Sequence, residues 1–136
     1  MSGMEELYKS INCHLEADFI RAQIKKYIES FPTQELDQRA TLFADDVVFT
    51  DPANAPSIIG LKDLYRFWEG LKAAPFDMRP EQHQLVVCGD SALLDFTMHM
   101  VAESGTQSLR VRDIIDFNEA GKIKSITAFW DPACMS

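Results

Sequence analysis

The second half of the chain is built from apolar runs that alternate with short turns. The runs are residues 84–88, 91–101, 108–118 and 122–130. Each turn between them contains a glycine beside a polar residue, a combination typical of β-hairpins. Such a series predicts consecutive antiparallel strands, and because side chains alternate across a strand, the long runs present one apolar face. The fold must therefore accommodate a strand-rich second half.

The first half of the chain shows a helical period instead. Residues 16–31 carry apolar side chains at the spacing of an amphipathic helix, which Pro32 is expected to end. Residues 33–44 and 61–72 predict two further helices, separated by a short strand at residues 47–51. Helices followed by hairpins predict an α+β fold, in which the helices cover one face of a curved sheet. We expect the cavity between the two layers to accept a small ligand.

Composition excludes several classes of partner. The chain has 136 residues and a net charge of -8, so we expect one domain that binds no nucleic acid, because phosphate binding needs clustered basic residues. No apolar run reaches the length of a membrane span, and the first residues are acidic where a signal peptide needs a basic start. Cys13, Cys88 and Cys134 are odd in number and far apart, which predicts free thiols. A cytoplasmic protein without a membrane partner is expected.

Three polar residues lie at positions where the pattern requires apolar ones. In residues 111–117 strand parity places Asp113 on the same face as a valine, an isoleucine and a phenylalanine. In residues 47–51 it places Asp51 on the face of a valine and a phenylalanine. Tyr27 lies within the apolar stripe of the first long helix and needs a partner for its hydroxyl if it is buried.

Each of these residues also has a structural interpretation. Asp51 precedes Pro52, which is a common way to begin a turn, and Tyr27 is a normal amphipathic core residue. Asp113 is harder to explain, although a buried hydrogen bond without a chemical role would account for it.

Taken together, the three residues suggest one chemistry. A carboxylate at the edge of a loop, Asp51, is placed to move a proton on carbon. Desolvation raises the pKa of a buried aspartic acid and keeps it neutral, so Asp113 becomes a hydrogen-bond donor. Two donors, Tyr27 and Asp113, then stabilise the oxyanion of an enolate. This chemistry needs no cofactor, and because His14, His83 and His99 lack partners at metal-ligand spacing, we expect no metal site.

At this point the sequence resembles a known family. The stretch FADDVVFTDPANAPSIIGLKDLYRFWEGL, residues 43–71, is similar to the corresponding part of bacterial Δ5-3-ketosteroid isomerases, the steroid delta-isomerases. The stretch IIDFNEAGKIKSITAFW, residues 114–130, is similar to their closing hairpin. These enzymes belong to the NTF2-like, SnoaL-like superfamily of cone-shaped α+β folds. The resemblance covers residues 16–131, so we interpret residues 1–15 as an N-terminal extension and residues 16–136 as one NTF2-like domain.

The resemblance assigns roles to the three unusual residues. It implies that Asp51, the acid of the DP dipeptide, is the general base, and that Tyr27 and Asp113 form the oxyanion hole. The implied reaction moves a C=C bond into conjugation with a ketone, from a 3-oxo-Δ5-steroid to a 3-oxo-Δ4-steroid. The implied partners are a small hydrophobic, steroid-like ketone and a second copy of the chain, paired as a homodimer through the outer sheet face of Thr97 and His99. The expected walls of the substrate pocket are Phe43, Trp68, Phe96, Met98, Met100, Ile126 and Trp130.

The sequence departs from the family near the tyrosine. A further tyrosine that often supports the first one is replaced here by Trp68, and a tyrosine near the second helix is replaced by Phe43. Indole donates a hydrogen bond but does not accept one as a phenol does, so this network is altered. Two alternatives stay open: a polyketide cyclase of the SnoaL type, and an NTF2-like module that only binds and dimerises.

Overall fold

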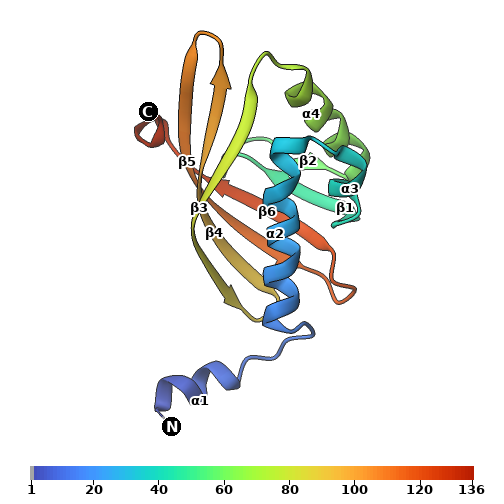
Figure 1. Ribbon diagram of the computed structural model, residues 1–136. Helices are drawn as coiled ribbons and strands as arrows, with labels where there is room; N and C mark the ends of the chain where they lie inside the picture. Colours follow the sequence, from blue (N-terminus) through green and yellow to red (C-terminus); the bar gives the residue numbers. More distant parts are fainter. Residues whose placement is uncertain (1) are drawn as a thin grey trace.

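A computed structural model describes residues 2–136. It contains four α-helices and six strands; the strands form one curved sheet, and helices cover one of its faces (Figure 1). The helices are α1 (Gly3–Lys9), α2 (Ala17–Thr33), α3 (Leu36–Ala40) and α4 (Leu61–Ala73), followed near the end by a 3-10 turn, Pro132–Cys134. The strands are β1 (Phe43–Thr50), β2 (Ile58–Ile59), β3 (Asp77–Cys88), β4 (Ser91–Ala102), β5 (Gly105–Phe117) and β6 (Ile123–Phe129). The predicted α+β class is confirmed.

The six strands form a single mixed sheet in the order β2-β1-β6-β5-β4-β3. Three hairpins connect β3 to β6 as the glycine-containing turns predicted, whereas β1 returns to pair in parallel with β6. Helix α2 crosses the concave face of the sheet, and α3 and α4 lie together beside β1 (Figure 1). The core between these layers contains the fully buried Ile20, Ile24, Ile115 and Ile126.

Burial in β5 follows the predicted alternation. Val111, Asp113, Ile115 and Phe117 are all buried, whereas Arg112 and Ile114 are exposed. The position of Asp113 on the core face is therefore set by the period of the strand, because a shift of one residue would expose its apolar neighbours.

The predicted second helix, residues 33–44, is wrong at both ends. Helix α2 continues through Pro32 to Thr33 and ends because Gln34 adopts a left-handed conformation, with φ 52°. Helix α3 is only five residues long, and Phe43 already belongs to β1, where it pairs with Ile123. Helical spacing alone could not reveal this strand, because its partner β6 lies far along the chain.

Strand β3 begins at Asp77, earlier than the predicted start at residue 84, and it contains Pro80. A proline removes one donor from a β-ladder, but β3 is one of the two edge strands of the described sheet and pairs with β4 alone. An edge position therefore explains why a proline lies inside this strand.

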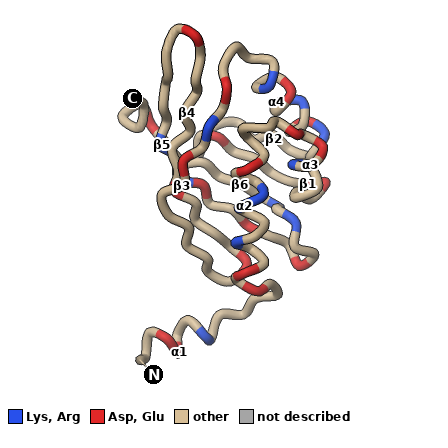
Figure 2. Tube along the Cα trace, viewed as in Figure 1, with Lys and Arg blue, Asp and Glu red and all other residues tan. Residues whose placement is uncertain are grey.

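Residues 8–15 contact the end of β3 and the turn that leads into β4. The Tyr8 hydroxyl donates to the carbonyl of Val87 at 3.1 Å, and the amides of His14 and Leu15 donate to the Asp90 carboxylate at 3.0 Å. Figure 2 shows that both α2 and α4 carry basic and acidic residues along their length. Among residues 2–136 no helix combines the length and the apolar character needed to cross a membrane.

Gly121 offers a test of the β5–β6 turn. Its φ is +82°, and an added Cβ would approach the ring of Phe19 to 2.7 Å, so Gly121→Ala should lower the free energy of unfolding by about 1–3 kcal/mol. Gly70→Ala is the matched control, because Gly70 is an exposed helical residue with open space around its Cα. There alanine should raise the free energy of unfolding by about 0.5–1 kcal/mol. Urea unfolding measures both; equal stabilities would contradict the predicted strain.

Candidate functional site

Asp113 lies in the middle of β5, deep on the core face of the sheet. Its register partners are Leu94 on β4 and Ala128 on β6, both buried, and only 3% of Asp113 itself is exposed. Burial, and to a smaller degree the nearby Asp51 carboxylate, raises the pKa of Asp113 well above its usual range. A carboxyl in this setting holds its proton near neutral pH and is able to donate a hydrogen bond.

Tyr27 projects from α2 into the same region of the core. Its side chain is buried, and burial raises the pKa of the Tyr27 phenol above its usual value; the acids Asp113 and Asp51 raise this pKa further, whereas the Arg39 cation lowers it. These influences place the tyrosine and both acids within electrostatic reach of one another.

The hydroxyl of Tyr27 and the carboxyl of Asp113 form no side-chain hydrogen bond within residues 2–136, where every side-chain nitrogen or oxygen atom sealed from solvent has a partner. The oxygen atoms of these two residues therefore border space that a water-sized group reaches. Two donors without protein acceptors in an apolar region are suited to bind one ligand oxygen.

Asp51 lies at the edge of this region, directly after the end of β1, and it is exposed. The indole N–H of Trp130 donates to its Oδ1 at 2.6 Å. The following loop is held against β6, because the amide of Ala53 donates to the carbonyl of Ala128 at 2.7 Å, and Ala128 is the register partner of Asp113. The loop that follows Asp51 is thus held against the strand that pairs with Asp113.

The expected pocket walls all contribute to the core. Phe43, Trp68, Phe96, Met98 and Ile126 are buried, and Met100 and Trp130 are partly buried against the same cluster. The aromatic rings around Tyr27 meet edge to face, with centroid distances of 5.1 Å to Phe31 and 5.8 Å to Phe43. Trp68 packs on Phe43 at 5.1 Å, so the indole fills space within the aromatic layer.

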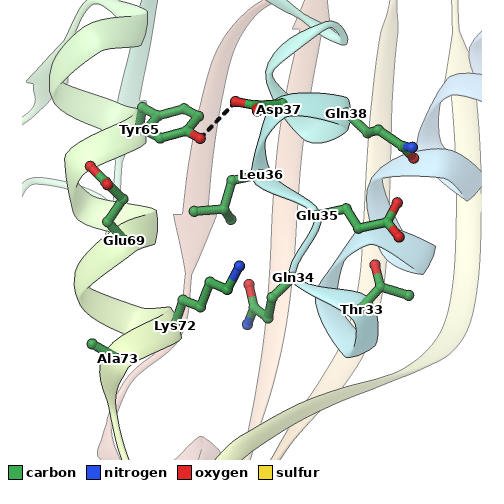
Figure 3. A pocket seen from close by; sticks show the side chains of 10 residues that line it. All are labelled: Thr33, Gln34, Glu35, Leu36, Asp37, Gln38, Tyr65, Glu69, Lys72 and Ala73. Carbon is green, nitrogen blue, oxygen red and sulfur yellow. Dashed lines mark hydrogen bonds between the residues drawn. The ribbon is translucent and has the colours of Figure 1, made fainter.

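A hollow lies elsewhere, between the α2–α3 junction and α4 (Figure 3). It has a volume of about 610 Å³ and is lined largely by polar side chains, with Tyr65 donating to Asp37 at 2.7 Å across it. None of Tyr27, Asp51 and Asp113 lines this hollow.

Sequence reasoning missed Arg39, a residue of α3 that is only 1% exposed. The available signal was its position three residues after the buried Leu36, on the inward side of a short helix. Because arginine is rarely buried, a search for apolar side chains at helical spacing does not include it.

Each of the three histidines contacts a nearby polar or acidic side chain. His14 contacts Asp90 and Glu119, His83 contacts Thr97, and His99 lies between Glu81 and Ser108. Within residues 2–136 no group of three or more metal-ligating side chains is arranged to hold an ion.

Comparison with known proteins shows what the sequence of this chain is similar to. The sequence pattern of the SnoaL-like domain matches residues 24–126. A steroid Delta-isomerase from Nocardioides simplex is 25% identical over 118 residues, which cover 85% of this chain and 93% of that enzyme.

Solved structures share the fold at low sequence identity. The epoxide hydrolase/cyclase-like enzyme SalBIII, described in pyran ring formation of the polyether salinomycin, superimposes with a TM-score of 0.80 at 15% identity over 89% of this chain and 97% of its own. A Mycobacterium tuberculosis protein in complex with estradiol-17β-hemisuccinate gives 0.76 at 18% identity, with coverages of 87% and 98%. A Δ5-3-ketosteroid isomerase from Mycobacterium sp. gives 0.75 at 15%, with coverages of 87% and 97%. The predicted NTF2-like fold is confirmed.

The raised pKa of Asp113 predicts a specific dependence of stability on pH. Above about pH 4 the unfolded chain loses this proton while the folded protein keeps it, so the folded state binds more protons and this residue's contribution to the free energy of unfolding falls as pH rises. Asp113→Asn removes the effect. The free energy of unfolding of this variant minus that of the wild type should rise with pH by up to about 1.4 kcal/mol per unit.

Urea unfolding between pH 4.5 and pH 8 measures this difference. The exposed Asp46→Asn on β1 is the control, and its difference from the wild type should stay flat. A flat difference for Asp113→Asn as well would show that the carboxyl is not held protonated by the fold.

Proposed function

The chain belongs to the SnoaL-like domain family, and from its buried acid, its buried tyrosine and its exposed acid we propose that it is a cofactor-free isomerase of ketosteroid-like substrates. In this proposal it moves a C=C bond into conjugation with a ketone, from the Δ5 to the Δ4 position. The observation that carries the proposal is Asp113, an acid with a raised pKa on the apolar face of β5.

The mechanism assigns one protonation state to each acid. Asp51 is exposed beside the indole N–H of Trp130, and as a carboxylate it removes a proton from the carbon next to the ketone. The electron pair moves onto the ketone oxygen and forms an enolate. Tyr27 and neutral Asp113 donate hydrogen bonds to this oxygen, and Asp51 returns the proton to the far end of the conjugated system. The substrate is isomerised without an oxidant or a reductant.

The surroundings of the three residues support a flat, hydrophobic substrate. The register partners of Asp113, Leu94 and Ala128, are buried apolar residues, and they belong to a core of aliphatic and aromatic side chains. Enolate stabilisation gains from such a region, because hydrogen bonds act more strongly where water is excluded. The 25% identical steroid Delta-isomerase and the fold neighbour that binds a steroid ester are consistent with this substrate class.

Asp51→Asn tests the assignment of the base. A 5-ene-3-ketosteroid gains ultraviolet absorbance when it becomes a conjugated enone, so turnover is followed directly. We expect Asp51→Asn to lower kcat by about 10²–10⁴-fold, because an amide does not accept the proton. Asp46→Asn, an exposed acid on the preceding strand, should keep wild-type activity. Equal activity of Asp51→Asn would exclude the mechanism, and no turnover by the wild type would favour the cyclase or binding alternatives.

Trp130→Phe tests whether the indole N–H holds Asp51 in position. The substitution keeps an aromatic wall but removes the 2.6 Å hydrogen bond to Oδ1, so kcat should fall about three- to tenfold. Phe129→Leu on the exposed outer face is the matched control and should leave kcat unchanged. A Trp130→Phe enzyme with wild-type kcat would show that Asp51 needs no such support.

A further inference from the structure

Arg39 is a buried cation without an acidic partner. Its Nε donates to the Ser30 hydroxyl at 2.8 Å, and its Nη2 donates to the Ser30 carbonyl at 3.0 Å and to the Gln34 amide oxygen at 3.1 Å. All three acceptors are neutral, and none of the ion pairs within residues 2–136 includes Arg39. A guanidinium stays protonated in proteins, so its positive charge is retained although burial lowers its pKa.

Aromatic rings connect this cation to Tyr27. The guanidinium carbon lies 4.2 Å from the ring centre of Phe31 and 5.0 Å from that of Trp68. Phe31 contacts Tyr27, and Trp68 contacts Phe43, which in turn contacts Tyr27. We call Tyr27, Phe31, Phe43 and Trp68 the aromatic ring cluster. Arg39 contacts two of its members, Phe31 and Trp68.

A hydrogen-bonded chain makes a second connection. The Ser30 hydroxyl, which accepts from Arg39, donates to the backbone carbonyl of Tyr27 at 2.6 Å. The distances of 5.1 Å from Tyr27 to Phe31 and 4.2 Å from Phe31 to the guanidinium together bound the separation of charge and tyrosine ring at about 9.3 Å. Arg39 thus lies close to Tyr27, but none of its described hydrogen bonds is made to the Tyr27 hydroxyl.

We propose that Arg39 is a positioning residue for the oxyanion site, whose buried and unneutralised charge stabilises negative charge on the oxygen that Tyr27 binds. This inference rests on the proposed function for its site. The burial of the charge supports it. At a separation of about 12 Å, which allows for the distance from the tyrosine ring centre to its hydroxyl, and at an effective dielectric constant near 20, a unit charge changes an equilibrium constant that involves a second charge by roughly tenfold.

The electrostatics of Tyr27 agree with this assignment. The Arg39 cation lowers the pKa of Tyr27, in opposition to burial and to both acids, which raise it. A group that eases negative charge on the phenol also strengthens the phenol as a donor to an enolate. A structural role alone does not require a charge here, since buried ionic groups are often replaceable by apolar residues of similar volume.

Binding of para-substituted phenols of graded acidity tests the proposal without relying on turnover. Acidic phenols enter an oxyanion site as phenolates, so the wild-type affinity, measured by titration calorimetry, should rise with phenol acidity, and Tyr27→Phe should weaken it. In Arg39→Met, which keeps the side-chain length but not the charge, affinity for the most acidic phenol should fall about tenfold, and for the least acidic less than about twofold. Arg39→Lys should retain most of the dependence on acidity.

Kinetics with the ketosteroid give a second readout: kcat of Arg39→Met should fall about tenfold with KM within about twofold. If Arg39→Met does not fold, Ser30→Ala takes its place, because it removes the acceptor of Nε, and a two- to threefold loss for acidic phenols is expected.

The outcomes separate the two proposals. A folded Arg39→Met, or Ser30→Ala in its place, that binds acidic phenols as the wild type does would overturn the role of Arg39 and leave the isomerase proposal intact. A wild-type protein that binds no phenol would contradict the oxyanion site and, with it, this inference.

Discussion

The apolar surroundings of one carboxyl set its protonation state. Asp113 lies between two strands at positions flanked by Leu94 and Ala128, where a charged carboxylate would lose its hydration without gaining a cation. The fold tolerates the residue because burial keeps it neutral, and a neutral acid is a hydrogen-bond donor. The apolar surroundings therefore both permit the residue and define the chemistry that it is able to perform.

The second acid is kept in the opposite environment. Asp51 leaves the sheet where β1 ends, remains exposed and accepts a hydrogen bond from Trp130. The contact of Ala53 with Ala128 ties the loop after Asp51 to the strand that pairs with Asp113, and in the proposed reaction the buried acid is the donor and the exposed acid is the base. Separation of roles by environment needs no metal or cofactor in the proposed reaction.

The aromatic ring cluster around Tyr27 brings a different kind of support. Phe43 and Trp68 pack in this cluster, and neither offers the Tyr27 hydroxyl a phenol partner. The buried Arg39 lies on the far side of these rings and supplies a positive charge. In the proposed site this charge acts on the oxyanion through a long-range electrostatic effect, which is less directional than a hydrogen bond and less dependent on exact geometry.

Periodicity in the sequence determined the strand-rich second half, the inward position of Asp113 and the amphipathic helix that carries Tyr27, because these depend on local spacing along one element. The resemblance to ketosteroid isomerases then supplied the association of Asp51 with both. Only the tertiary structure decided that Phe43 begins a strand, that Trp130 meets Asp51, and that Arg39 is buried without an acid. These three facts depend on contacts between segments far apart in the chain, and local patterns carry no record of which distant segment supplies the partner.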